Sequence, residues 1–318
     1  MSIISSDIQK AKAILENEEL VAIPTETVYG LAGNIFSEKA IKSIFNTKQR
    51  PLFNPLIVHI SSVTELPNIV KEIPKKAALL AHKFWPGSLT LVLEKNKNIP
   101  DLITAGKNTV AVRIPNHKTT LALLAQLSFP LAAPSANPFN RISPTKASHV
   151  AHYFKDQIQM VLEGGQCKNG IESTIIGFEN DEPVIYRLGA IAIEEIEKVV
   201  GKVIVKNLAE SNPNAPGMLK KHYAPRTKTI LTSTLEQEIS KYASKKIGVL
   251  SFHTSNQSHK VDFEIVLSPK QDLKEAAGKL YDAMHQLDLL ELDIIIIEKL
   301  PNIGLGKSMN DRLQRASF

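Results

Sequence analysis

The sequence has few of the residues that mark several common protein classes. A single cysteine, Cys167, excludes disulfides within the chain and cysteine-rich zinc sites, and it fits a reducing cytoplasm. Apolar runs such as Ile294 to Ile297 are far too short to span a membrane. Charged residues are spread through the first twenty positions, so no secretory signal is expected. Aromatic residues make up only 6% of the chain, which gives little material for a platform that stacks nucleic-acid bases.

The remaining composition is that of an ordinary globular protein. The chain has 318 residues, of which 43% are hydrophobic and 22% charged, so it can bury a full core and is long enough for two domains. Its formal net charge of +6 is mildly basic. Such a balance favours anionic ligands, either nucleotides in a pocket or RNA on a surface, without choosing between them.

Residues 1–206 alternate between short apolar segments and amphipathic segments, which predicts an α/β (α+β) domain with a large twisted mixed sheet and flanking helices. The expected strands are Leu20–Ile23, Leu56–Ile60, Leu89–Leu93, Val110–Ile114, Met160–Leu162, Thr174–Phe178, Val184–Tyr186 and Val203–Val205. The expected helices are Asp7–Asn17, Ser37–Thr47, Lys75–Phe84, Thr119–Leu127, Thr145–Phe154 and Ala192–Val200.

A second, smaller domain is predicted after a linker. Residues 207–229 contain few apolar side chains and several prolines, which is typical of a linker. Residues 230–318 predict a Rossmann-like parallel α/β domain, in which four consecutive isoleucines form a strand buried on both faces. Its expected elements are helix Leu235–Tyr242, strands Ile247–Phe252, Phe263–Leu267 and Ile294–Glu298, helix Asp272–Leu287 and a final helix.

The most informative stretch runs from Leu20 to Ile60. An apolar strand meets a polar turn that holds Thr27. Tyr29-Gly30 and Gly33 follow, and an amphipathic helix then leads into Lys48-Gln-Arg50-Pro. Two cations spaced i, i+2 and stopped by proline cannot share a helix face, so they are free to converge on one anion. A strand, turn, helix and second strand in this order is how α/β proteins build ligand sites at strand ends.

Further polar residues end or interrupt apolar strands. Arg113 lies in a strand that otherwise reads as buried, so it either bridges a core carboxylate or holds the anionic group of a ligand. Ser135 and Asn137 stand between two prolines, and Ser143 could cap the helix that follows it. Further candidates are Ser173 before a strand, Arg187 at a strand end, and the Lys220-Lys-His-Tyr223 segment of the linker.

Three other motifs favour structural explanations. The segment Gly304-Leu-Gly-Lys-Ser308 imitates the end of a phosphate-binding P-loop, but position 301 is proline where the first glycine belongs. His149 and His152 have no carboxylate or cysteine cluster beside them, so a helix-surface pair is favoured over a metal site. Cys167 has no base at a recognisable spacing, which favours a structural thiol over a nucleophile.

Taken in order, the motifs closely match one family over nearly the whole chain. The chain resembles the YrdC-like threonylcarbamoyl-AMP synthases in the long form with a C-terminal domain. The matching motifs are Pro24-Thr-Glu-Thr-Val-Tyr-Gly30, Lys48-x-Arg50, Phe84-Trp-Pro-Gly-Ser-Leu-Thr90, Ser135-x-Asn137, Gly170-Ile-Glu-Ser-Thr174, Pro216-Gly-Met and His222-Tyr-Ala-Pro225. The departures are Gln49, Phe139-Asn140 and Ala215, and none removes a group that the chemistry requires.

The resemblance implies an enzyme that joins L-threonine, bicarbonate or CO2, and ATP into threonylcarbamoyl-AMP, with release of pyrophosphate. It implies Lys48 and Arg50 as catalytic cations, with Mg2+ on the ATP phosphates and no protein metal ligand. Implied ATP contacts are Arg50, Asn54, Thr109, Ser135, Asn137, Ser143, Arg187 and Tyr223. Implied threonine contacts are Thr27, His59, Arg113, the backbone at Ala133, and Ser173.

The resemblance also implies partners and a closing segment. The protein would act in the cytoplasm and pass its product to a tRNA threonylcarbamoyl transferase. A weak contact between this chain and tRNA is compatible with the resemblance. Because a carbamate decomposes in water, residues 207–228 with Tyr223 would act as a lid. Two alternatives remain: an RNA-binding module without catalysis, and a carbamoyl transferase of hydrogenase maturation, which the single cysteine disfavours. A regulatory nucleotide site in the small domain is supported only by the predicted fold of that domain.

Overall fold

The structure is a computed structural model that describes residues 3–206, 222–254 and 261–317. The larger part of the molecule is built on a mixed sheet to which eleven strands of the described chain contribute. In spatial order they are β1 (Ile3–Ser5), β8 (Met160–Leu162), β2 (Val21–Ile23), β3 (Gly30–Asn34), β7 (Leu131–Ala132), β4 (Ile57–His59), β6 (Thr109–Arg113), β5 (Leu89–Glu94), β9 (Thr174–Glu179), β10 (Glu182–Arg187) and β11 (Ile204–Val205).

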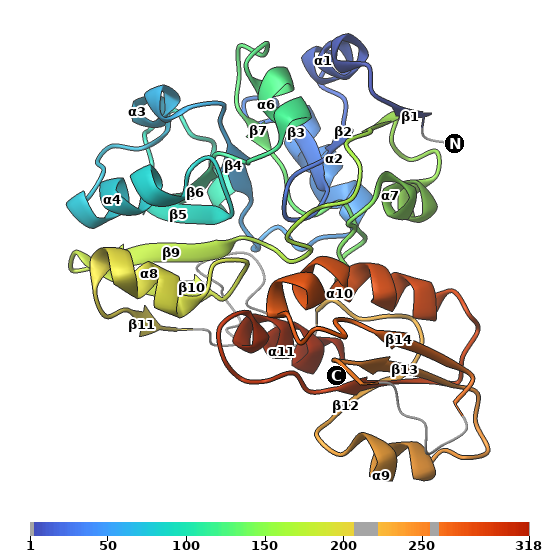
Figure 1. The fold of residues 1–318 in the computed structure, drawn as a ribbon. Coiled ribbons are helices and arrows are strands. Elements are labelled where there is room, and N and C mark those ends of the chain that lie inside the picture. The colour runs from blue at the N-terminus through green and yellow to red at the C-terminus, as the bar shows by residue number, and fades with distance from the viewer. Residues whose placement is uncertain (1–2, 207–221, 255–260, 318) are drawn as a thin grey trace.

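Helices flank this sheet, as the amphipathic pattern predicted (Figure 1). They are α1 (Ile8–Glu16), α2 (Glu38–Lys48), α3 (Leu66–Ile69) after the 3-10 turn η1 (Val63–Glu65), α4 (Lys75–Phe84), α5 (Asp101–Thr104), α6 (Lys118–Leu124), α7 (Ala147–Phe154) and α8 (Ile193–Val200). Side chains set two of the helix starts, because Asp7 accepts from the Lys10 amide and Ser37 accepts from the Ala40 amide.

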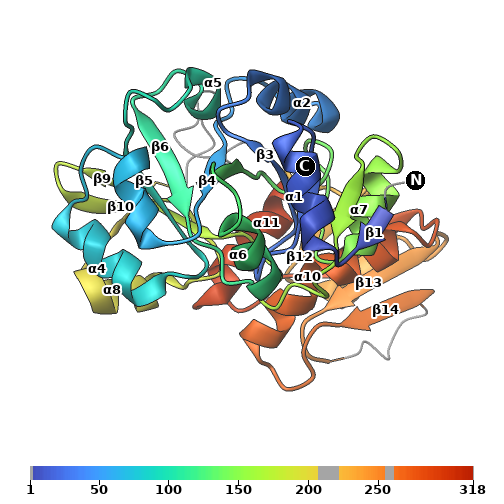
Figure 2. The ribbon, with the colours of Figure 1, turned by 90° about the horizontal axis from the view of Figure 1, so that it is seen from above.

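The second sheet belongs to the C-terminal domain, and all its neighbouring strands are parallel, as predicted. In spatial order its strands are β12 (Thr229–Thr232), β15 (Ile294–Glu298), β13 (Ile247–Ser251) and β14 (Phe263–Val266), with helices α9 (Leu235–Ser240), α10 (Leu273–Asp288) and α11 (Leu305–Ala316). Figures 1 and 2 show α10 and α11 against the larger domain. The four isoleucines Ile294–Ile297 are at most 1% exposed, which explains the all-apolar strand.

Two local details differ from the sequence prediction. The glycine-containing segment Gly30–Asn34, for which no strand was expected, is strand β3, and it pairs antiparallel with β2. A Cβ at Gly33 would lie 3.0–3.3 Å from side-chain atoms of Leu20, Ile44 and Ala40, so glycine serves close packing of α2 on this strand. Ser143 does not cap α7, because that helix begins at Ala147 without a side-chain cap and the Ser143 hydroxyl binds a carboxylate instead.

The strands of the first domain position the site by bringing distant segments to one edge. Parallel pairing of β4 and β6 sets His59 beside Arg113, and antiparallel pairing of β2 and β3 closes the turn that holds Thr25 and Thr27. Within the described residues, no helix is long and apolar enough to cross a membrane.

Candidate functional site

The turn between β2 and β3 is organised by one hydroxyl. Thr25 Oγ1 accepts from the Thr27 and Val28 amides at 3.1 and 3.2 Å and donates to the Val28 carbonyl at 2.6 Å. This local pattern satisfies the backbone polar groups of a turn whose residues are buried. The turn therefore presents Thr25 and Thr27 in a fixed position at the strand ends.

The two cations that follow α2 differ in where they lie. Gln49 adopts a left-handed conformation (φ 52°) that ends the helix. The buried Lys48 ammonium donates to the Ser135 carbonyl at 2.5 Å and to the Asn137 carbonyl, so it holds the Ser135–Asn137 loop. The Arg50 guanidinium donates to the carbonyls of Asn54 and Pro55 at 3.2 and 2.8 Å and faces the cavity.

Both of these cations are costly to bury without an anion. Burial holds the pKa of Lys48 well below its usual value, and the charge of Arg50 adds to this effect. Burial, with the charge of Arg187, lowers the pKa of Arg50 to about 9. No carboxylate of the described residues forms an ion pair with either cation. An anionic ligand would supply the missing compensation.

Arg113 bridges a core carboxylate, which is the first of the two roles left open by its position in the sequence. Its guanidinium forms an ion pair with Glu26 at 2.6 Å and donates to Thr27 Oγ1 at 2.9 Å and to the Gly87 carbonyl at 3.1 Å. It also lines the cavity. These contacts use three of the five N–H groups, which leaves one on each terminal nitrogen without a partner in the described chain. The two together can hold a carboxylate.

His59 and Glu26 flank Arg113. Burial, with the charge of Arg113, lowers the pKa of His59 to about 3, so its imidazole is neutral at physiological pH. Burial alone would raise the pKa of Glu26, but the Arg113 charge and hydrogen bond hold it below its usual value. This side of the site therefore carries a paired, ionised carboxylate and a neutral imidazole.

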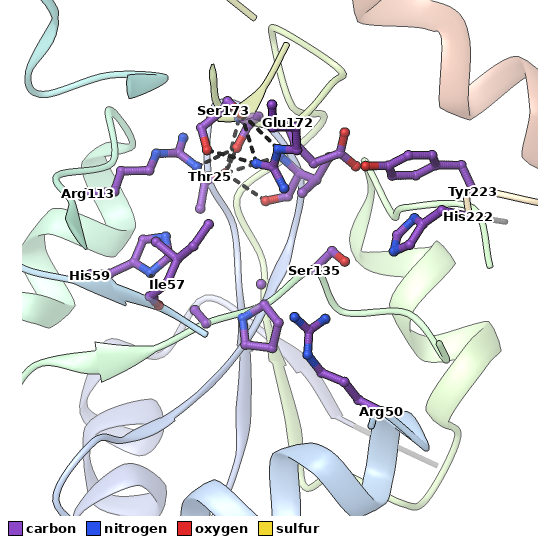
Figure 3. Close-up of a pocket in the computed structure, with 16 residues that line it drawn as sticks. Thr25, Arg50, Ile57, His59, Arg113, Ser135, Glu172, Ser173, His222 and Tyr223 are labelled. Carbon is purple, nitrogen blue, oxygen red and sulfur yellow. Dashed lines mark hydrogen bonds between the residues drawn. The ribbon is translucent and has the colours of Figure 1, made fainter. Parts of the chain in front are cut away.

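The opposite side of the cavity is built by β9, β10 and the end of the linker. Arg187 donates to the Ser173 carbonyl at 2.9 Å and to its hydroxyl at 3.1 Å. Tyr223 is 1% exposed and adopts a left-handed conformation (φ 64°), with the His222 ring 4.0 Å away. Figure 3 shows Arg50, Arg113, Glu172 and Tyr223 around a common space.

The predicted residues converge, with one exception. Nine of them line one cavity: Thr27, Arg50, His59, Arg113, Ala133, Ser135, Ser173, Arg187 and Tyr223. Four more are buried behind that lining: Lys48, Asn54, Asn137 and Ser143. The Lys48 ammonium donates to the Ser135 and Asn137 carbonyls, and the Asn54 carbonyl accepts from Arg50. The Ser143 hydroxyl donates to Glu172. Thr109 is exposed at the opposite end of β6 from Arg113 and does not join them.

The sequence interpretation gave no individual role to three polar residues that line the cavity: Thr25, Glu172 and His222. Each belongs to a motif that was recognised, but a motif does not show which side chains face inward. For Glu172 a signal was available, because a carboxylate between an apolar residue and two hydroxyls at a strand start is unlikely to be buried unpaired. The predicted lid, residues 207–228, lies outside the described residues over 207–221.

Comparisons with known proteins agree over both domains. A family model described as "Telomere recombination" matches residues 13–189, and one described as "Threonylcarbamoyl-AMP synthase, C-terminal domain" matches residues 191–317. The chain is 40% identical to threonylcarbamoyl-AMP synthase of Pyrococcus abyssi (98% of this chain, 94% of that one). It is 39% identical to that of Bacillus subtilis (98% and 92%).

A solved structure agrees in fold over the full length. The crystal structure of P. abyssi Sua5 complexed with L-threonine superimposes with a TM-score of 0.92 at 38% identity and covers 99% of this chain and 98% of that one. The likeness extends over both domains, and relatives this similar are named as enzymes, so the interpretation as a non-catalytic RNA-binding module has no support. The chain therefore belongs to the threonylcarbamoyl-AMP synthase family.

Proposed function

We propose that the protein is an L-threonylcarbamoyladenylate synthase, which makes threonylcarbamoyl-AMP and pyrophosphate from L-threonine, bicarbonate or CO2, and ATP. The observation that carries the proposal is that Arg50, Arg113 and Arg187, far apart in the sequence, line one cavity. A cavity with several guanidinium groups suits two anionic substrates, a triphosphate and an amino-acid carboxylate.

The nucleotide side is proposed around Arg50, Arg187 and the Ser135–Asn137 loop. Within the described residues the Arg50 guanidinium donates only to backbone carbonyls, so a phosphate would neutralise it. Asn54 supports this assignment, because both polar atoms of its buried side chain lack a hydrogen-bond partner in the described chain. Lys48 acts by holding the loop, while Ser143 and Tyr223 complete the proposed ATP contacts.

The threonine side is proposed around Arg113. Its two remaining N–H groups would bind the carboxylate of threonine, and Thr27 or Ser173 would bind the hydroxyl. The neutral ring of His59 and the backbone at Ala133 line the same part of the cavity. The side chain of the substrate is therefore recognised by hydroxyl groups next to a charged clamp.

The chemistry needs positioning more than a protein nucleophile. The threonine amine takes up CO2 as a carbamate, the carbamate oxygen forms a bond to the α-phosphorus of ATP, and the bond from that phosphorus to the pyrophosphate oxygen breaks. Charge on the phosphate oxygens is stabilised by Arg50, with Lys48 fixed behind it. Mg2+ enters with ATP as part of the substrate, and no cluster of metal-ligating side chains competes for it in the described residues.

The cavity is small, with a volume of about 50 Å3. His222 and Tyr223 line the side of the cavity next to the linker, and their movement would enlarge it for ATP. The same residues would then cover the carbamate and exclude water from it. The product is proposed to pass to a tRNA threonylcarbamoyl transferase.

The test is pyrophosphate release from Mg-ATP with bicarbonate, with and without L-threonine, with mass spectrometry of the product. We expect release that depends on threonine and a product of the mass of threonylcarbamoyl-AMP. Serine should support a slower reaction, because one methyl group in a pocket changes the free energy by about 1–3 kcal/mol. Release that is independent of threonine, or none at all, would refute the proposal.

A further inference from the structure

The C-terminal domain contacts the one carboxylate found among the described cavity-lining residues, Glu172. This side chain is 6% exposed and accepts three hydrogen bonds. Ser143 Oγ donates to Oε1 at 2.6 Å, Tyr281 of α10 donates to Oε2 at 3.0 Å, and Arg312 of α11 donates its Nε proton to Oε2 at 3.1 Å. Two of the three donors belong to the other domain, although they lie 109 and 140 residues away in the chain.

Arg312 is unusual among these donors. Its side chain is 0% exposed, it lies 5.6 Å from the ring of Tyr223, and it forms an ion pair with Glu172. A fully buried guanidinium is expensive unless its charge is compensated. Glu172 and Asp311 both compensate it, and the pair with Glu172 joins α11 to the segment that precedes β9.

The position of Glu172 creates an electrostatic problem for the proposed substrate. Among the described residues that line the cavity, Glu172 is the only one with a carboxylate. Burial alone would raise its pKa, but the charge of Arg312, then that of Arg187, and the Ser143 hydrogen bond hold the pKa below its usual value. The group is therefore ionised at neutral pH, and a negative charge there would repel the phosphates of ATP.

We propose that Arg312 of the C-terminal domain is a positioning residue of the nucleotide site, which neutralises and orients Glu172 so that the cavity accepts a triphosphate. The inference rests on the proposed function for the identity of the nucleotide. Glu172 in turn fixes the Ser143 hydroxyl, and its neighbour Ser173 is bound by Arg187. Docking of the C-terminal domain thus sets both the charge and the geometry of the ATP side of the cavity.

A purely structural role for Arg312 makes a different prediction. If the ion pair only held the domains together, its removal would lower the melting temperature and would weaken both substrates in step with the loss of folded protein. If Arg312 acts on the charge of the cavity, its loss should affect ATP far more than threonine, and removal of the Glu172 charge should reverse the effect.

The experiment measures binding of Mg-AMPPNP and of L-threonine by isothermal titration calorimetry to Arg312→Met, Glu172→Gln and the double variant, with melting temperatures in parallel. A single uncompensated charge near the phosphates should weaken AMPPNP binding of Arg312→Met about 10- to 100-fold. Threonine binding should change less than about threefold. The double variant should return to within about threefold of Glu172→Gln.

Two comparisons keep the test decisive. Lys307→Met removes another cation of α11 that contacts the first domain, the exposed ion pair with Glu194 at 2.7 Å, and it should leave AMPPNP binding unchanged. Glu172→Gln should bind AMPPNP at least as tightly as the wild type, which tests the charge argument even if Arg312→Met does not fold.

The inference is overturned if Glu172→Gln loses AMPPNP affinity more than about tenfold, if the double variant binds as weakly as Arg312→Met, or if both ligands weaken equally. Binding of AMPPNP without threonine-dependent pyrophosphate release would refute the proposed function and leave the inference supported by the binding cycle. A wild-type protein that binds no nucleotide would overturn both.

Discussion

Substitution of Arg113 by lysine tests the threonine clamp in a form that keeps the protein folded. Arg113 is 4% exposed and forms an ion pair with the buried Glu26. Arg113→Ala would leave that carboxylate uncompensated and would destabilise the fold by about 3–5 kcal/mol, a large part of the stability of an ordinary domain. Lysine keeps a positive charge beside Glu26 but lacks the planar pair of N–H groups.

The expected loss follows from the hydrogen bonds of Arg113. Three N–H groups are used by Glu26, Thr27 and Gly87, and the two that remain would bind the threonine carboxylate. Loss of a charge-assisted hydrogen bond costs about 1.5–3 kcal/mol, which corresponds to about a 10- to 100-fold rise in the Kd for threonine. The Kd for Mg-AMPPNP should change less than about threefold.

Calorimetric titrations of both ligands, well below the melting temperature, measure these values. Arg226→Lys is a matched control, because Arg226 is an exposed arginine that does not line the cavity, and it should bind both ligands as the wild type does. If Arg113→Lys weakened both ligands equally, or left threonine binding intact, the assignment of Arg113 to the threonine carboxylate would be wrong.

Three further predictions concern the nucleotide side of the cavity, the contact between α7 and α10, and the core of the first domain. Arg50→Met should weaken Mg-AMPPNP binding about 10- to 100-fold in calorimetry with little change for threonine, because it removes a charge-assisted phosphate contact; equal loss of both ligands would contradict this. Burial, with the charge of His149 stacked 3.9 Å away, lowers the pKa of His285 to about 3. As pH falls, the unfolded chain therefore takes up a proton at this residue before the folded protein does, and the free energy of unfolding falls as pH drops from about 6.5 towards 3. His285→Gln should therefore reduce the slope of unfolding free energy against pH by up to about 1.4 kcal/mol per pH unit between pH 6 and 4 in urea denaturation, and an unchanged slope would count against this account. Gly33→Val should destabilise the first domain by about 1–3 kcal/mol, because even a Cβ would crowd Leu20, Ile44 and Ala40; a melting temperature equal to that of the wild type would show that α2 can shift.

Local sequence patterns were enough for the elements that carry most of the site. Strands β2, β4 and β6 and helix α2 have clear apolar periods, and the polar groups Thr27, Arg113 and Lys48 on or next to them were recognised from the sequence pattern. Their convergence could be expected because the ends of neighbouring strands meet at one edge of a sheet. The family resemblance supplied what periodicity could not, namely which side chains belong to which substrate.

The remaining features depend on contacts between distant segments. Strands β3 and β7 are short and were not expected from the sequence, and β3, which holds two glycines, is stabilised by its pairing with β2 and β7. The partner of Arg113 is 87 residues away, and that of Arg312 is 140 residues away. No local pattern encodes such pairs, so the sequence could not identify Glu26 as the partner of Arg113 or Arg312 as the partner of Glu172.

The most direct test of the central claim is a crystal structure of the protein with Mg-AMPPNP and L-threonine bound together. The account predicts that both ligands occupy the cavity between Arg50, Arg113 and Arg187, with the threonine carboxylate on Arg113 and the amine facing the α-phosphate. It would be contradicted by density that places the two ligands in separate pockets, or the threonine carboxylate away from Arg113.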